Sequence, residues 1–162
     1  MAKITRQEAR EMLLSLLFET EFHGGEDPHA VFELACRERE IPDVKYIKEG
    51  FFGVLSRIEV LDRVIGKYSK GWKADRLSRV SRAIIRLAVY EMLFVEDIPC
   101  NVSISQAVEL SVKYGEDKAK QFVNGVLSSV YKDLQSMGAE ALISSVSSAE
   151  DVAEDQTEGE NA

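Results

Sequence analysis

Two histidines and many carboxylates are the side chains in this sequence best suited to chemistry at a site. His23 and His29 flank the Gly24-Gly25 pair. A metal site would need further Cys, His or carboxylate ligands at a fixed spacing, and these histidines have no nearby cysteine and no helical pairing. We therefore expect exposed loop histidines and no metal. The carboxylates are spaced as solvated helix faces, with no convergent set of catalytic groups.

Glycines that could hold a phosphate are also poorly arranged. The sequence contains no P-loop and no GxGxxG motif, and without strands neither could be placed where its mechanism requires. Gly50 and Gly53 flank two phenylalanines inside a predicted helix, which indicates close packing of helices. We expect a protein without a cofactor that is not an enzyme.

Basic residues at the start of the chain point to a different chemistry. Lys3, Arg6 and Arg10 lie at or before the first predicted helix, and Arg6 and Arg10 are one turn apart. Cations beside aromatic rings such as Phe18 suit RNA, because phosphates take the charge while unpaired bases stack on rings. The alternative is that these arginines pair with Glu8, Glu11 or the acidic end of the chain, and composition does not separate the two.

A second basic run extends from Lys67 to Arg86, with seven basic residues and one acidic residue, Asp75. Arg76, Arg79 and Arg82 recur at a spacing of three, on the side opposite the apolar stripe, and Arg86 follows one turn later. A binding surface and an ordinary solvated helix face explain this strip equally well.

The net charge of −8 argues against nucleic acid until its distribution is considered. Seven acidic residues and no Lys or Arg lie between Ser136 and Ala162, whereas residues 1–135 hold 21 acidic and 20 basic residues. We therefore predict a near-neutral domain over 1–135 and an acidic, disordered tail over 136–162. A weak last helical turn over 139–146 is compatible with the sequence.

The elements that must position these residues are all helices. Apolar residues recur at helical spacing throughout, and no strand-like alternation persists. Thr5 with Glu8 predicts a capping box for the first helix, Asp27-Pro28 the start of the second, and Ser103 with Gln106 another capping box. Residues 44–69 predict one long helix or two with a bend near 57–60. A helix from about 77 ends near Phe94, and further helices end at Gly115 and near Gln135. The fold predicted is all-α, about seven helices in two packed groups forming one domain.

The compartment predicted is the cytoplasm. No signal peptide is recognised at the N-terminus, and no segment approaches the roughly 20 apolar residues of a membrane span. Cys36 and Cys100 form no CxxC motif and are expected to be free thiols.

Four blocks of the sequence, in order, resemble one known family. They are Arg6 with Ala9, Arg10 and Glu11, then the segment WKADRLSRVSRAIIRLAVYE over 72–91, the residues from Ile98-Pro99 to Tyr114-Gly115, and FVNGVL over 122–127. This pattern is similar to that of the NusB transcription antitermination family over about residues 3–134.

The resemblance implies a fold, a function and partners. Family members have seven helices in two bundles and pair with a small-subunit ribosomal protein, NusE. Together they bind the boxA sequence of ribosomal RNA transcripts and join other Nus factors on RNA polymerase, which suppresses termination. By position, the residues implied to contact RNA are Lys3, Arg6, Arg10, Phe18, Lys118 and Phe122. Ser81 and Arg82 fall near the implied protein-partner surface.

Departures from the family pattern keep alternatives open. The first helix has two arginines where many members have more, and Ser81 replaces a usual acidic residue. A helical protein-interaction module with little RNA binding is the main alternative, and the accessory domain of an RNA cytosine methyltransferase is another. The acidic tail either solubilises the chain or covers the basic helix as an RNA mimic. Monomer and homodimer are both compatible with the sequence.

Overall fold

Helices account for the regular structure throughout the residues that the computed structural model describes, 3–69 and 77–147. No strand occurs in those two ranges, so the all-α prediction is confirmed. The helices are α1 (Arg6–Thr20), α2 (Pro28–Glu38), α3 (Lys45–Leu55), α4 (Ile58–Tyr68), α5 (Arg79–Phe94), α6 (Cys100–Tyr114) and α7 (Ala119–Met137). A further helix spans 139–147.

The first two helices begin where the sequence places their caps. The Thr5 hydroxyl accepts a hydrogen bond from the Glu8 amide at 3.0 Å, and the Glu8 carboxylate accepts one from the Thr5 amide at 3.2 Å. This reciprocal capping box satisfies two amides that the first turn leaves unpaired. At α2, the Asp27 carboxylate caps the helix and Pro28 occupies its first turn. Both predicted starts are confirmed.

The region 44–69 forms two helices, the second of the two predicted alternatives. α3 ends at Leu55 and α4 begins at Ile58. Between them the Ser56 hydroxyl and the Arg57 guanidinium each donate to the carbonyl oxygen of Gly53 at 3.2 Å. Side chains at the bend thus satisfy a carbonyl that the end of α3 leaves without a helical donor.

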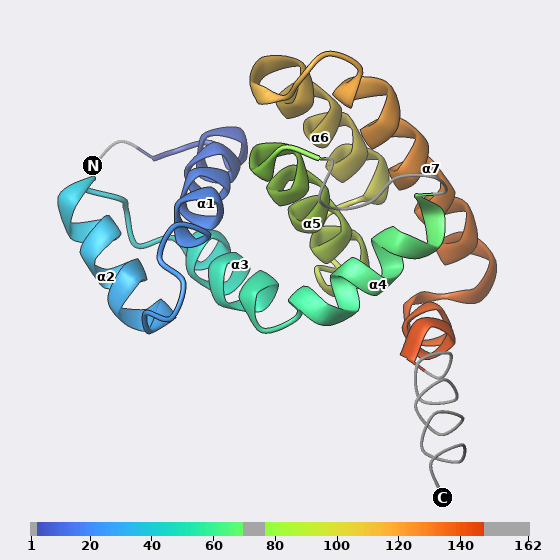
Figure 1. The fold of residues 1–162 in the computed structure, drawn as a ribbon, viewed down its shortest axis with the longest axis horizontal. Helices are drawn as coiled ribbons and strands as arrows, with labels where there is room; N and C mark the ends of the chain where they lie inside the picture. Colours follow the sequence, from blue (N-terminus) through green and yellow to red (C-terminus); the bar gives the residue numbers. More distant parts are fainter. Residues whose placement is uncertain (1–2, 70–76, 148–162) are drawn as a thin grey trace, which may run out of the picture.

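The central helix of the fold is α5, which contacts α1, α3, α4, α6 and α7 (Figure 1). A helix surrounded on most sides must be apolar around most of its circumference. Eleven of its residues are accordingly buried: Ser81, Ala83, Ile84, Ile85, Leu87, Ala88, Val89, Tyr90, Glu91, Met92 and Leu93. Figure 1 shows α1, α2 and α3 on one side of α5 and α6 and α7 on the other.

The predicted capping box at Ser103 is wrong. α6 begins at Cys100 with Pro99 as its N-cap residue, four residues before the predicted N-cap Ser103. The Ser103 hydroxyl donates instead to the Glu91 carboxylate at 2.9 Å. A buried carboxylate needs donors, and this tertiary demand outweighs the local capping pattern. Gly115 does form the C-cap, as predicted.

Helical structure continues past residue 136, where the acidic tail was predicted to begin. α7 runs to Met137, Gly138 turns the chain with a φ of 84°, and the helix over 139–147 follows. Leu142 and Val146 in that helix are buried against the rest of the core. Burial of these two side chains explains why the packed part of the chain extends to 147. Residues 148–162, which hold six of the seven acidic residues of the predicted tail, lie outside the described ranges.

Candidate RNA and partner interface

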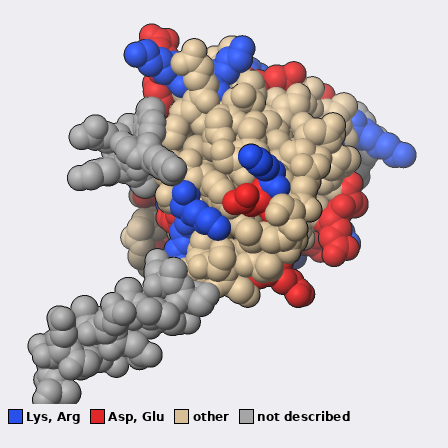
Figure 2. All heavy atoms as spheres, turned by 90° about the vertical axis from the view of Figure 1, so that its right-hand side faces the viewer, with Lys and Arg blue, Asp and Glu red and all other residues tan. Residues whose placement is uncertain are grey.

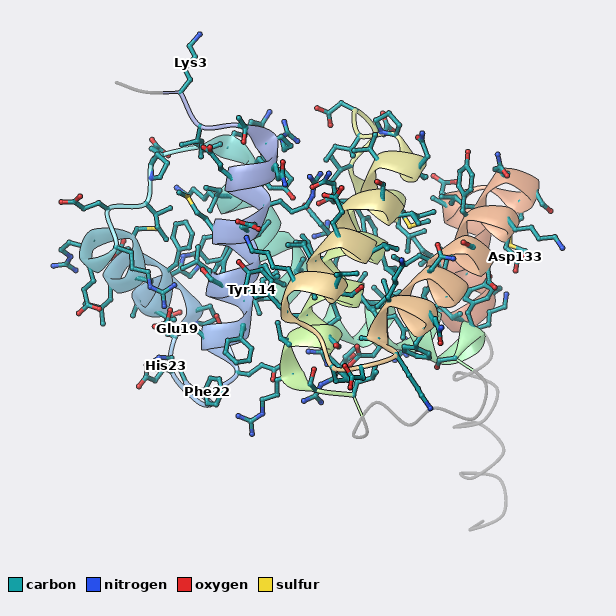
Figure 3. The ribbon with its side chains drawn as sticks, turned by 90° about the horizontal axis from the view of Figure 1, so that it is seen from above. Lys3, Glu19, Phe22, His23, Tyr114 and Asp133 are labelled. Carbon is teal, nitrogen blue, oxygen red and sulfur yellow. The ribbon has the colours of Figure 1, made fainter. Side chains whose placement is uncertain are left out.

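The N-terminal end of α1 presents the first two residues of the implied RNA surface. Lys3 is exposed and projects away from the body of the protein (Figure 3). Arg6 is also exposed, and its guanidinium carbon lies 4.5 Å from the centre of the Tyr46 ring. A cation over an aromatic face is held in place electrostatically while its charge stays accessible. Arg6 is therefore an exposed cation whose side chain is positioned by the Tyr46 ring.

Arg10 has a different environment from Arg6. Its side chain is 4% exposed, and its guanidinium makes a two-pronged ion pair with Glu91 on α5, with distances of 2.9 and 3.0 Å. The helical spacing predicted a shared basic face, but the structure divides the two arginines between surface and core. No local pattern could reveal this, because the partner carboxylate lies 81 residues further along the chain.

The buried Glu91 carboxylate accepts two further hydrogen bonds. The Tyr46 hydroxyl donates to it at 2.5 Å, and the Ser103 hydroxyl donates at 2.9 Å. Burial raises the pKa of Tyr46 far above its ordinary value, and the charge of Glu91 adds to the effect. Burial alone would lower the pKa of Arg10, yet its hydrogen bonds and charge interaction with Glu91 raise that pKa. The network stays fully ionised at Arg10 and neutral at Tyr46 over the physiological range.

The other end of α1 carries an aromatic pair. Phe18 is half-buried and meets Phe22 edge to face, with ring centres 5.2 Å apart. Phe22, in the turn after α1, is 58% exposed. The implied RNA residue Phe18 is thus accessible at the opposite end of α1 from Lys3 and Arg6.

The basic strip on α5 is an ion-pair network. Arg79, Arg82 and Arg86 approach the carboxylate of Glu21 at 3.8, 3.6 and 3.2 Å. Arg86 also makes a two-pronged pair with Asp62 at 2.8 and 2.9 Å. The sequence did not indicate this convergence, because Glu21 follows α1 and Asp62 belongs to α4. Arg76, the first residue of the predicted strip, lies outside the described residues.

Ser81, implied to lie near the partner surface, is buried. Its hydroxyl donates to Glu116 at 2.6 Å, as does that of Ser78, the N-cap of α5. Burial acts to raise the pKa of Glu116, but the hydrogen bonds from the two serines outweigh it and the pKa is lowered. Arg82, beside Ser81, keeps 26% of its side chain exposed. Of the two implied partner residues, only Arg82 reaches the surface.

Lys118 and Phe122 lie one turn apart at the start of α7. Lys118 is exposed and has a φ of 74°, in the left-handed region that non-glycine residues seldom adopt. Phe122 is half-buried and lines a groove with Tyr68 and Gly125. The structure thus offers both residues at one helix end, with the cation held in a strained backbone conformation.

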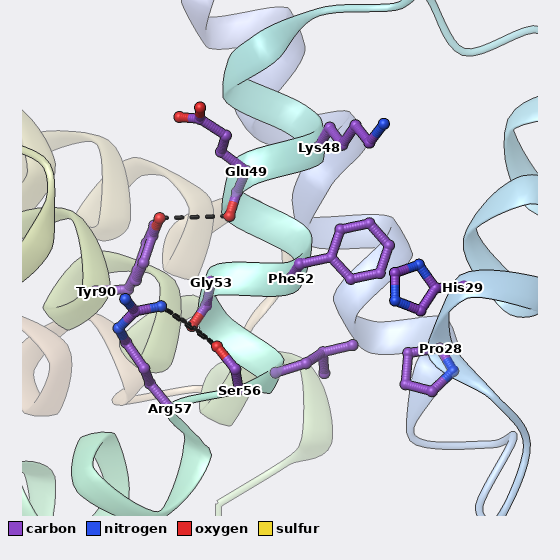
Figure 4. Close-up of a pocket in the computed structure, with 10 residues that line it drawn as sticks. Pro28, His29, Lys48, Glu49, Phe52, Gly53, Ser56, Arg57 and Tyr90 are labelled. Atoms are coloured by element: carbon purple, nitrogen blue, oxygen red, sulfur yellow. Dashed lines mark hydrogen bonds between the residues drawn. The ribbon is translucent and has the colours of Figure 1, made fainter.

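A pocket formed by described residues does not resemble an active site. It lies between α2 and α3, and Figure 4 shows Tyr90 donating to the Glu49 carbonyl and Arg57 donating to the Gly53 carbonyl. His29 stacks on Phe52 with ring centres 4.5 Å apart. Tyr90 and Arg57 thus donate to backbone carbonyls of α3, and Arg57 also donates to the Ser56 hydroxyl at 3.3 Å, so these groups serve the end of α3. Within the described ranges no cluster of three or more metal-binding side chains occurs.

Charged side chains are scattered over one face of the molecule. The face in Figure 2, which is the right-hand side of Figure 1, is mainly uncharged, with separate acidic and basic side chains. This agrees with the near balance of charge over residues 1–135. In the described part of the chain, no helix is both long and apolar enough to span a membrane.

Comparisons with known proteins agree with one another. A model of the NusB family matches residues 7–132. The transcription antitermination protein NusB of Bacillus pumilus is 43% identical over 130 residues, which cover 80% of this chain and 97% of that protein. A structure of NusB from T. maritima aligns with a TM-score of 0.69 and 35% identity, over 81% of this chain and 93% of the other. A chain in a complex of the antitermination factors NusB and NusE with double-stranded RNA aligns with a TM-score of 0.68 and 32% identity, over 79% of this chain and 96% of the other.

Proposed function

The chain belongs to the NusB family of transcription antitermination proteins, and on that basis we propose that it binds boxA-type RNA of ribosomal RNA transcripts together with NusE. The observation that carries this proposal is the similarity, over nearly the whole of the other chain, to a protein solved with NusE and RNA. The complex acts in the cytoplasm with other Nus factors on RNA polymerase. This is the role of an adaptor and not of an enzyme.

The RNA surface proposed for this chain comprises Lys3, Arg6, Phe18, Lys118 and Phe122. Lys3, Arg6 and Lys118 are exposed cations, and Phe18 and Phe122 are half-buried rings. Phosphates pair with the cations while unpaired bases stack on the rings. Arg10 supports this surface from inside, through Glu91 and Tyr46, and makes no phosphate contact of its own.

The protein-partner surface proposed is the exposed part of Arg82. Ser81 contributes to this surface indirectly. Its hydroxyl and that of Ser78 hold Glu116, which lies between α6 and α7, against the start of α5. The proposed organisation is two helical bundles within one domain.

A titration of boxA RNA tests the proposal. RNA is added at physiological salt to the chain alone, to NusE alone and to the mixture. We expect the mixture to bind much more tightly than either protein, because the partner extends a surface that is sparse in cations. Equal affinity for the chain alone and the mixture would overturn the shared-surface proposal.

One observation favours a second candidate, a protein-interaction module with little RNA binding. Burial of Arg10 leaves Arg6 as the exposed arginine of α1, and each lost phosphate contact weakens RNA binding. The same titration decides: NusE binding without any gain in RNA affinity would favour this second candidate.

A further inference from the structure

Phe22 is a large aromatic side chain that the fold leaves mostly exposed to solvent. It lies in the turn that follows α1 and is 58% exposed, more than any other aromatic residue in the described part of the chain. Figure 3 shows it at the edge of the molecule, near His23 and remote from Lys3. A ring that is more than half exposed gains only part of its hydrophobic stabilisation in the free protein.

The ring is nevertheless held in a defined position. The Arg79 guanidinium carbon lies 4.6 Å from its centre, and the Phe18 ring meets it edge to face at 5.2 Å. The side chain of Arg79 is itself 51% exposed. Phe22 therefore presents an accessible aromatic surface whose orientation is fixed by two neighbours from different helices.

Charge around this ring favours an anionic occupant. Three guanidinium groups, those of Arg79, Arg82 and Arg86, approach the one carboxylate of Glu21, and Arg86 also pairs with Asp62. The Nε atom of Arg82 is buried and has no hydrogen-bond partner among the described residues. Aromatic rings and arginine planes together stack unpaired bases, while the arginine charge attracts the adjacent phosphate.

We propose that Phe22 and Arg79 form a stacking site for one unpaired RNA base, which extends the RNA surface past Phe18 to the start of α5. The ring of Phe22 takes the base, and Arg79 takes the neighbouring phosphate. This inference rests on the proposed function, because it needs an RNA strand that already contacts Phe18. A protein partner would favour an apolar pocket over a single ring bordered by arginines.

Two substitutions separate the roles within the site. Each is measured in the complex with NusE, as RNA affinity over a range of salt. Phe22→Leu keeps an apolar side chain and removes the ring, so we expect about a fivefold or greater loss of affinity, the scale of one base stack, with an unchanged salt slope. Arg79→Gln removes one phosphate contact, so we expect a weaker affinity and a slope smaller by about 0.7, the value per phosphate for single strands.

Matched controls come from α2. Leu34→Ala removes another exposed apolar side chain, and Arg37→Gln removes another exposed arginine. Neither should change RNA affinity by as much as the corresponding site variant. Equal losses from site and control variants would overturn the stacking site, and so would a Phe22→Leu complex with weakened NusE binding and unchanged RNA affinity.

A fluorescent reporter tests contact directly. Trp72 is the only tryptophan, so Trp72→Phe combined with Phe22→Trp places the signal at position 22 alone. RNA should quench or shift this emission when it binds the NusE complex, and Trp72→Phe alone serves as the affinity control. RNA binding without any change at position 22 overturns this inference and leaves the proposed function intact. Failure of the wild-type complex to bind RNA overturns the proposed function instead.

Discussion

Arg10 on α1 and Glu91 on α5 form a buried two-pronged ion pair, with 4% and 1% of the respective side chains exposed. The pair joins the N-terminal helix to the central helix, and hydroxyls from α3 and α6 complete it through Tyr46 and Ser103. Four helices thus converge on one carboxylate. A residue implied by the family to contact RNA is here an internal anchor.

Breaking this pair should strongly destabilise the fold. Arg10→Met leaves the Glu91 carboxylate buried without its cation, so we expect a loss of about 3–5 kcal/mol in the free energy of unfolding. Arg6→Ala, at the exposed position one turn earlier, should cost about 0.5 kcal/mol or less. Urea unfolding measures both. An Arg10→Met protein as stable as Arg6→Ala would contradict the anchoring role.

Tyr46 connects the anchor to the surface cation. Tyr46→Phe keeps the ring beneath Arg6 but removes the hydroxyl that donates a hydrogen bond to Glu91. The free energy of unfolding should therefore fall by about 1–3 kcal/mol, with RNA affinity nearly unchanged. Tyr46→Leu removes the ring as well and should weaken RNA binding about two- to fivefold, the scale of an exposed cation–π contact. That additional loss should vanish when Arg6 is already alanine. A loss of equal size in both backgrounds would show that Tyr46 does not act through Arg6.

Two glycines of the third helix are required by close helix contacts. A Cβ added at Gly53 would lie 2.4 Å from the Tyr90 hydroxyl oxygen and 2.6 Å from two carbons of its ring, and one at Gly50 would lie 2.4 Å from a terminal carbon of Leu13. Gly53→Ala should therefore cost about 1–3 kcal/mol. Gly50→Ala should cost less, because the end of a leucine side chain can move.

The control for these substitutions is a helical glycine with open space. A Cβ at Gly125 of α7 meets nothing within 4 Å, so Gly125→Ala should stabilise the protein by about 0.5–1 kcal/mol. Thermal unfolding of the three variants gives the order directly. Equal destabilisation by all three would show that helix contacts do not decide the effect.

Local signals in the sequence predicted the fold well. The caps at Thr5 and Asp27 and the helical spacing of apolar residues depend on neighbours within one or two turns, and both caps are found. The start of α6 was misplaced because Ser103 serves Glu91 on a different helix. Prediction from local sequence fails where a polar side chain hydrogen-bonds to a residue on another helix.

The candidate site shows the same limit more sharply. Arg10 and Ser81 were chosen by position in a motif, and both are buried because of partners 81 and 35 residues away. Spacing placed Arg6 and Arg10 on one face, but it could not show which arginine faced a carboxylate from another helix. The three-arginine cluster on Glu21 is likewise a product of tertiary packing.

Stability should depend on pH through Glu116. Hydrogen bonds from Ser78 and Ser81 lower the pKa of this carboxyl in the folded protein, so its contribution is present above the unfolded pKa of about 4.3 and is lost as pH falls through the lower, folded value. The side chain is exposed, so the contribution should be small, about 0.5 kcal/mol. Glu116→Gln should therefore be less stable than wild type near pH 7, with a difference that shrinks below about pH 5. Glu96→Gln, at another exposed acid, is the control, and a difference that grew toward acid pH would refute this assignment.

The strained backbone at Lys118 separates stability from RNA binding. Lys118→Gly relieves a left-handed conformation that costs a non-glycine residue about 1–2 kcal/mol, so the variant should unfold at a higher temperature. It also removes a proposed phosphate contact, so RNA affinity in the NusE complex should fall and the salt slope should decrease by about 0.7. Lys118→Arg keeps the charge and the strain, and should leave both properties close to wild type. If Lys118→Gly is more stable than wild type but binds RNA equally tightly, Lys118 makes no phosphate contact and lies outside the RNA surface.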